Sequence, residues 1–183
     1  MKGDDLSLVI YMASDLLIRR KLTFRAAGPD GEERRVVFVK KPAEGIEHVL
    51  MKAMLWALYL PRYPEMLVEV PIGARYKPDL VQPRPGLDPA SGPLFWGEAG
   101  HVGQKKLERL AKGFASTHVV VGKWDTALRP HVRVVERALK GRERAAPFEF
   151  IRFPADSERF FQEDGRIVVT FDQVEFVRAG RRP

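Results

Sequence analysis

Three acidic residues stand at positions from which carboxylates could bind a divalent cation. Glu47 begins an apolar segment with helical periodicity, Asp79 follows a proline within a strand-like segment, and Glu98 ends the apolar run 94–98. Mg²⁺ takes oxygen ligands from one or two carboxylates and leaves its other positions to water and substrate phosphate. We therefore predict that Glu47, Asp79 and Glu98 converge to bind Mg²⁺ or Mn²⁺.

Two of these acids also have simpler interpretations. Glu47 tops an otherwise apolar helical stripe and should be partly buried, but an acid in the first turns of a helix is also favoured by the helix dipole. Asp79 could pair with Lys77 or Arg75 at the end of a strand. Glu98 precedes a turn into a helix, and sites in α/β sheets gather beyond the carboxyl ends of strands.

The turn after Glu98 suits a phosphate. Gly100 and Gly103 permit close backbone approach, and the amides of the following helix, together with Lys105 and Lys106, could meet phosphate oxygens. The Walker A pattern of phosphate-binding loops is not matched in any register.

The order of elements predicts an α/β fold in which helices flank a mixed β-sheet. Two strands in 6–24 and a third at 34–39 form an amino-terminal antiparallel meander. The later expected helices are 43–60, 103–115 and 127–140, and the later expected strands are 66–72, 76–82, 94–98, 117–121, 148–153 and a pair within 166–177. Helices alternating with strands indicate a sheet covered on both faces.

Composition narrows the class of protein. The chain has 183 residues, suited to a single domain, and it has no cysteine, which excludes disulfides and thiolate metal sites. The four histidines lack the spacing of a zinc site. Without a signal peptide or a long apolar run, we expect a cytoplasmic protein with no membrane contact. The net charge of +7 favours a polyanionic partner.

A helix bearing Glu47, then Pro78-Asp79, then Glu98 with nearby lysines, resembles the PD-(D/E)XK nuclease superfamily and, within it, the YaeQ-like proteins. The resemblance implies a restriction-endonuclease-like αβββαβ core within 43–153, preceded by a β-rich segment 1–42 and followed by strands in 154–183. It also implies that Asp79 and Glu98 are metal ligands and that Glu47 is a third ligand or orients water.

Gly100 departs from the superfamily pattern, because Glu-x-Gly stands where Glu-x-Lys is expected. In several branches of the superfamily the following helix supplies the missing cation. Lys105 is therefore the first choice for the catalytic lysine and Lys106 the second. Lys106, Arg109 and Lys77 are candidate substrate-binding residues.

Basic side chains recur on two predicted helices and could follow a phosphate backbone. They are Lys105, Arg109 and Lys112 on the first helix, and Arg129, Arg133, Arg137 and Lys140 on the second, where ordinary solvation of an exposed face is the favoured interpretation. Tyr76 and Trp96 are interpreted as core packing rather than base stacking.

The leading functional hypothesis is Mg²⁺- or Mn²⁺-dependent hydrolysis of DNA or RNA phosphodiester bonds. One alternative is a nuclease-like fold without turnover that binds nucleic acid or protein. Another is an adaptor whose basic helices dock an acidic protein.

Overall fold

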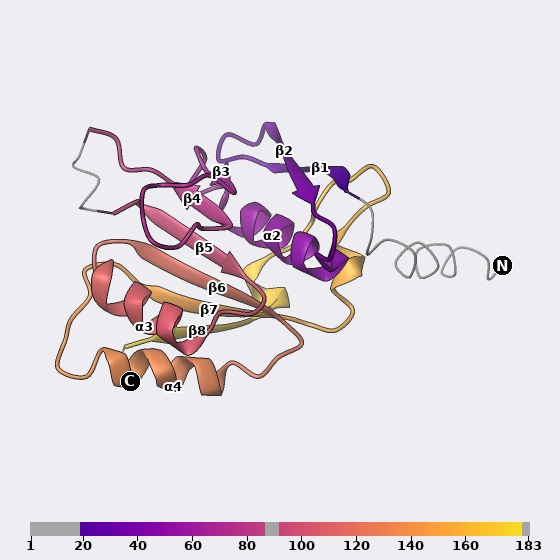
Figure 1. Cartoon of the computed structure of the whole chain (residues 1–183). Coiled ribbons are helices and arrows are strands. Elements are labelled where there is room, and N and C mark those ends of the chain that lie inside the picture. The colour runs from indigo at the N-terminus through magenta and orange to yellow at the C-terminus, as the bar shows by residue number, and fades with distance from the viewer. Residues whose placement is uncertain (1–18, 87–91, 181–183) are drawn as a thin grey trace.

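A small antiparallel sheet and a mixed six-stranded sheet, with three α-helices, form the part of the chain that this computed structural model describes, residues 19–86 and 92–180 (Figure 1). The strands are β1 (Arg20–Ala27), β2 (Glu33–Lys40), β3 (Leu67–Val68), β4 (Leu80–Gln82), β5 (Phe95–Ala99), β6 (His118–Trp124), β7 (Phe148–Phe153) and β8 (Glu175–Ala179). The helices are α2 (Ile46–Tyr59), α3 (Gln104–Gly113) and α4 (Arg129–Ala138).

The six strands of the larger sheet lie in the order β3-β4-β5-β6-β7-β8. The pairs β5–β6 and β6–β7 are parallel, and the other three pairs are antiparallel. The mixed α/β class predicted from the sequence is therefore confirmed. The element order from α2 to β6 is one helix, three strands, a second helix and a fourth strand.

The observed strands differ from the predicted strands in two places, and one predicted strand lies outside the described residues. The first strand of the meander falls in 1–18, outside the described residues, whereas β1 and β2 form the expected antiparallel hairpin. The segments expected as strands at 66–72 and 76–82 contain only the short β3 and β4, because Pro71 and Pro78 cannot donate to a ladder. The expected pair within 166–177 is wrong: β8 forms there, and Ile167 makes only an isolated bridge.

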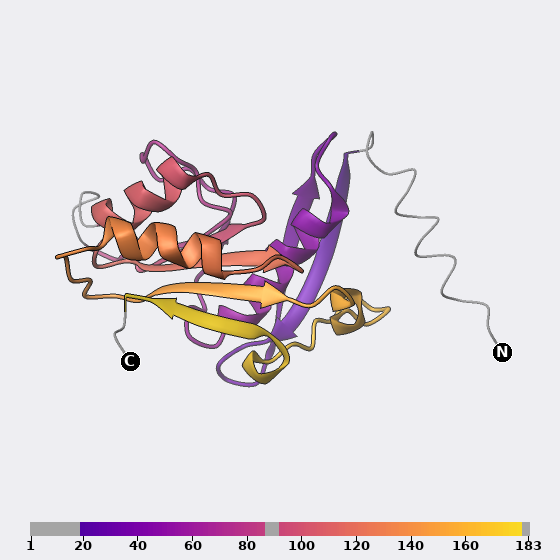
Figure 2. The same cartoon turned by 90° about the horizontal axis from the view of Figure 1, so that it is seen from below.

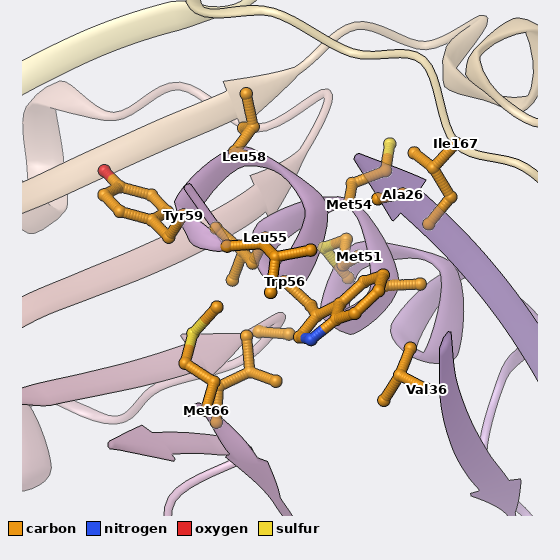
Figure 3. Packing of buried hydrophobic residues seen from close by; sticks show 14 of the residues in the cluster. Ala26, Val36, Met51, Met54, Leu55, Trp56, Leu58, Tyr59, Met66 and Ile167 are labelled. Atoms are coloured by element: carbon orange, nitrogen blue, oxygen red, sulfur yellow. The ribbon is translucent and has the colours of Figure 1, made fainter. Parts of the chain in front are cut away.

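Helix α2 lies between the two sheets, which explains why it is apolar on nearly every side (Figure 3). Met54 and Trp56 belong to the cluster that includes Ala26 and Val36 of the hairpin. On the other side, a Cβ added to Gly122 of β6 would lie only 2.9 Å from Leu55 Cδ1. Gly122 therefore allows α2 to pack closely on the sheet, so that the first turn of the helix is fixed relative to the end of β5.

Helices α3 and α4 cover the opposite face of the six-stranded sheet (Figures 1 and 2). Arg144 anchors the end of α3, because its guanidinium donates hydrogen bonds to the carbonyls of Leu110, Ala111 and Phe114. These carbonyls belong to the last turn, where no intrahelical donor is available. The anchored helix holds its first turn beside β5.

A buried polar network crosses the sheet at Glu149 of β7. One oxygen of Glu149 accepts hydrogen bonds from Tyr59 Oη (2.8 Å) and pairs with His118 Nε2 (2.7 Å), while the other binds the Arg178 guanidinium. Burial opposes ionisation, but the hydrogen bonds from His118, Tyr59 and Arg178 outweigh it and lower the pKa of Glu149 to about 2. The network therefore holds an ionised carboxylate inside the fold.

We expect Glu149→Gln to lower the free energy of unfolding at pH 7 by about 3 kcal/mol, because the substitution removes the charge that pairs with Arg178 and His118. The pKa of Glu149 is lowered, so its stabilisation is present above its ordinary pKa of 4.5 and is lost as the pH falls towards about 2. Urea unfolding at several pH values measures both effects. A variant as stable as the wild type at pH 7, or a stability gap that does not narrow on acidification, would contradict this account.

Candidate functional site

Asp79 and Glu98 are brought together by the pairing of β4 with β5. Leu80, the first residue of β4, lies opposite Gly97, so Asp79 comes just before the paired segment and lies near Glu98, whose pKa is affected by the charge of Asp79. Two hydrogen bonds fasten Asp79 to β5: the Asp79 N–H donates to the Gly97 carbonyl (3.2 Å), and the Ala99 N–H donates to Asp79 Oδ2 (2.8 Å). Acids that are 19 positions apart in the sequence thereby become neighbours.

Glu98 is a buried carboxylate with two donors. Trp96 Nε1 donates to its Oε1 at 2.6 Å, and Lys106 Nζ lies 2.6 Å from its Oε2. The residue is only 3% exposed, and burial, followed by the nearby negative charge of Asp79, raises the pKa of Glu98 above its ordinary value. A carboxyl group held in this state gains from any further cation that reaches it.

Asp79 is also largely buried, but its carboxylate is stabilised. Burial acts to raise its pKa, and the interactions with His48 and with the Ala99 N–H outweigh burial, so the pKa of Asp79 is lowered. His48 Nε2 lies 3.6 Å from Asp79 Oδ2, and the attraction to Asp79 raises the pKa of His48. The two acids of the pair therefore differ: Asp79 ionises readily, and Glu98 does so reluctantly.

A group of charged side chains around His48, which was not predicted from the sequence, holds its ring in place. Lys52 is fully buried in α2, and its ammonium lies 2.7 Å from Glu44 Oε1 and 2.8 Å from Glu69 Oε1. Burial disfavours the charge on Lys52, but the hydrogen bonds to Glu44 and Glu69 raise its pKa above the ordinary value. Glu44 Oε1 also lies 2.9 Å from His48 Nδ1. The feature of the sequence that could have indicated this cluster is Lys52, a lysine among apolar residues of a predicted helix.

The structure does not bring Glu47 into this site. The sequence stripe predicted a partly buried carboxylate, and this prediction is wrong, because the Glu47 side chain is exposed. Since α2 begins at Ile46, Glu47 lies in the first helical turn, where the helix dipole favours an acid. The side chain of this helix that approaches Asp79 is instead that of His48.

The structure reverses the order in which the sequence ranked Lys105 and Lys106 as candidates for the catalytic lysine. Lys106, the second choice, contacts Glu98, whereas Lys105, the first choice, is exposed on α3. Gly100 has φ +72°, a backbone conformation that a lysine would adopt only with strain. The conformation of this turn thus explains why a lysine is disfavoured at position 100 itself.

The other predicted substrate-binding residues take separate positions. Arg109 lines a groove beside α3, whereas the Lys77 side chain is simply exposed. Within the described residues, Asp79 forms no ion pair with Lys77 or Arg75, so the structural alternative for Asp79 does not hold. The aspartate faces inward, towards β5 and α2.

The donor set fits a hard cation that is held by two carboxylates. Among the described residues, no three acidic or histidine side chains converge closely enough to hold a metal ion, so the predicted cluster of three acids does not form, and the two neighbouring acids are Asp79 and Glu98. Mg²⁺ and Mn²⁺ accept such a pair, because water and substrate phosphate complete their coordination. Histidine is a poorer ligand for Mg²⁺, and His48 is already engaged with two acids.

Comparison with known proteins supports the architecture. No protein-family model and no curated protein matches this chain. The chain resembles the crystal structure of the YaeQ protein from Xanthomonas axonopodis pv. citri, with a TM-score of 0.56 and 12% sequence identity over 78% of this chain and 77% of that one. The fold is YaeQ-like. At this identity the likeness concerns the fold alone, and the YaeQ-like part of the sequence prediction is confirmed at that level.

In the part of the chain that the structure describes, none of the helices combines the length and the apolar character that a membrane span requires.

Proposed function

We propose that this protein is a metal-dependent nuclease of the PD-(D/E)XK type that hydrolyses phosphodiester bonds in nucleic acid. The observation that carries the proposal is the proximity of Asp79 to Glu98, with the Ala99 N–H donating to Asp79 Oδ2 and the Lys106 ammonium 2.6 Å from Glu98. Two acids from neighbouring strands and one lysine are the groups that phosphodiester hydrolysis with a hard cation requires. The element order from α2 to β6 and the YaeQ-like fold agree with this proposal.

Asp79 and Glu98 would hold Mg²⁺ or Mn²⁺. Such a cation, when bound, lowers the pKa of a coordinated water and offsets the negative charge of the phosphoryl group. The lowered pKa of Asp79 keeps one ligand ionised, and cation binding would offset the raised pKa of Glu98. Lys106, drawn from Glu98 towards the substrate, would stabilise the charge that develops on phosphate oxygens.

His48 would position Asp79 and would not touch the reacting atoms. Its two ring nitrogens lie beside Glu44 and Asp79, which fixes the orientation of the ring. Lys52 in turn fixes Glu44 from inside the core. This series of ion pairs would hold the Asp79 carboxylate in one orientation before the metal binds. A ligand that is already oriented binds the metal more tightly.

A hydrolysis assay tests the proposal. Purified protein is incubated with 5′-labelled single-stranded and duplex oligonucleotides in Mg²⁺, in Mn²⁺ and in EDTA. We expect shortened products that depend on added metal and disappear in EDTA. If DNA and RNA remain intact with either metal while the folded protein is present in excess, the proposed activity is refuted.

A specific observation favours a second candidate, a nuclease-like fold that binds nucleic acid without cleaving it. Each acid of the pair already has a cationic neighbour, His48 beside Asp79 and Lys106 beside Glu98, and the expected third carboxylate of Glu47 is exposed. A module of this kind would bind oligonucleotides equally well in EDTA and in Mn²⁺ and would give no products. The assay above therefore separates the two candidates.

A further inference from the structure

A groove runs beside α3, and one of its lining residues, Trp96, donates a hydrogen bond to Glu98 of the candidate site. It consists of two adjoining hollows of about 390 and 610 Å³ between the loop that carries Arg75 and Tyr76 and the exposed side of α3. We call it the α3 groove, and its charged and aromatic lining residues are Arg75, Tyr76, Trp96, Lys105, Glu108, Arg109, Lys112 and Phe114.

The α3 groove is strongly cationic. Four of its five charged lining residues are basic, and within the described residues none of these four forms an ion pair with a carboxylate. The acid that lines the groove, Glu108, accepts a hydrogen bond from Gln104 at 2.7 Å along the same helix. Lys105, Arg109 and Lys112 recur at i, i+4 and i+7, so their charges follow one side of α3 over about 10 Å. An elongated polyanion complements this lining.

Aromatic rings interleave with these charges. Tyr76 is half-buried, with the Arg75 guanidinium 5.8 Å and the Lys106 ammonium 5.4 Å from its ring centroid. Phe114 packs on the buried Trp96 at a centroid separation of 5.0 Å, and both line the groove. The interpretation of Tyr76 as core packing is therefore incomplete, because its ring lies at the wall of a groove. Bases can stack on such rings only when they are unpaired.

The groove is connected to the candidate site by two side chains. Lys106 contacts both the Tyr76 ring and Glu98 Oε2, and Trp96 contributes to the groove lining while its Nε1 donates to Glu98 Oε1. A strand in the groove would therefore have a phosphate beside Lys106 and Glu98. Aromatic residues interleaved with cations at the entrance to a carboxylate pair suit an unpaired strand better than a duplex, whose bases are hidden in the stack.

We propose that the α3 groove binds single-stranded nucleic acid and delivers one of its phosphates to Glu98 and Lys106. This inference rests on the proposed nuclease function for its consequence, but the binding itself is independent of cleavage. Backbone phosphates would lie along Lys105, Arg109 and Lys112, and an unpaired base would stack on Tyr76 and displace the exposed Arg75 side chain.

Fluorescence anisotropy in EDTA tests the inference, with a labelled single strand and the same sequence as a duplex. We expect the wild type to bind the single strand at least about fivefold more tightly than the duplex, since stacking contributes about 1–3 kcal/mol per base. The triple variant K105Q/R109Q/K112Q should lower single-strand affinity by about tenfold or more in 50 mM salt. It should also make the slope of log affinity against log salt shallower by about 2, because three phosphate contacts are lost.

The α4 variant R133Q/R137Q/K140Q is the matched control, since it removes the same charge from exposed residues of the neighbouring helix and of the turn that follows it. We expect it to change affinity by less than about threefold. The single variant Tyr76→Ala should lower single-strand affinity by about tenfold without changing the salt slope. Circular dichroism melting verifies that each variant is folded.

The outcomes separate cleanly. The proposal that the α3 groove binds single strands is refuted if the α3 and α4 variants lose affinity equally. It is also refuted if the duplex binds as tightly as the single strand or more tightly, or if the wild type shows no measurable binding. Because EDTA prevents metal-dependent cleavage, a protein that binds as described but never hydrolyses the strand refutes only the nuclease proposal. Metal-dependent hydrolysis by a triple variant with wild-type affinity refutes only the groove.

Discussion

Glu98→Gln is expected to reduce metal-dependent hydrolysis of nucleic acid by about 10³-fold, equivalent to about 4 kcal/mol of transition-state stabilisation. Glutamine has nearly the same shape and can still accept the hydrogen bond from Trp96 Nε1, but it carries no charge to hold a divalent cation. Single-turnover rates with the labelled oligonucleotide at saturating Mn²⁺ measure the effect.

The same substitution should not destabilise the protein. Ionised Glu98 is unfavourable in its buried position, as its raised pKa indicates, so removal of the charge also removes its desolvation cost. The Lys106 side chain is 20% exposed and can turn to solvent. Glu136→Gln on α4, an exposed acid, is the charge-matched control and should retain wild-type activity. A Glu98→Gln protein that retains more than about a tenth of the wild-type rate would exclude Glu98 as an essential ligand.

Lys106→Met is expected to lower kcat by about 10² to 10³-fold with a smaller change in KM, because the ammonium beside Glu98 would act on charge that develops in the transition state. Methionine keeps much of the apolar length of the side chain and its packing against Tyr76. Steady-state kinetics on a single-stranded oligonucleotide separate the two parameters.

Lys105→Met provides the informative contrast. Lys105 is exposed and lines the α3 groove, so its loss should raise KM severalfold and leave kcat nearly unchanged. Lys140→Met, in the turn after α4, controls for the loss of one exposed positive charge and should alter neither parameter. If Lys105→Met abolished kcat and Lys106→Met did not, the catalytic assignment of these lysines would be reversed.

The sequence predicted the elements that periodicity controls. Helix α3 and strand β7 form where apolar spacing and turn residues indicated, and β1 and β2 form the expected antiparallel hairpin, joined by a turn over Gly28–Gly31. The prediction was wrong in extent for the strands around β3 and β4, where prolines interrupt the hydrogen-bond ladder of the sheet. Their pairing depends on contacts with distant residues that a local pattern does not contain.

The carboxylate pair could be anticipated, but the surrounding charges could not. Asp79 precedes β4 and Glu98 lies near the end of the neighbouring β5, and their placement is visible in the sequence as a proline-aspartate and an apolar run that ends in glutamate. The failure of Glu47 has a physical cause, since a shift of one residue changes direction around a helix by about 100°. His48, rather than Glu47, consequently approaches Asp79. Adjacent lysines such as Lys105 and Lys106 differ in the same way.

Binding of Mn²⁺, measured by isothermal titration calorimetry without nucleic acid, tests the central claim that Asp79 and Glu98 share one cation. The account predicts a single site in the wild type, lost in Asp79→Asn and in Glu98→Gln, and retained in Glu47→Gln because that side chain is exposed. Wild-type protein that takes up no Mn²⁺, or uptake that survives both Asp79→Asn and Glu98→Gln, would contradict it.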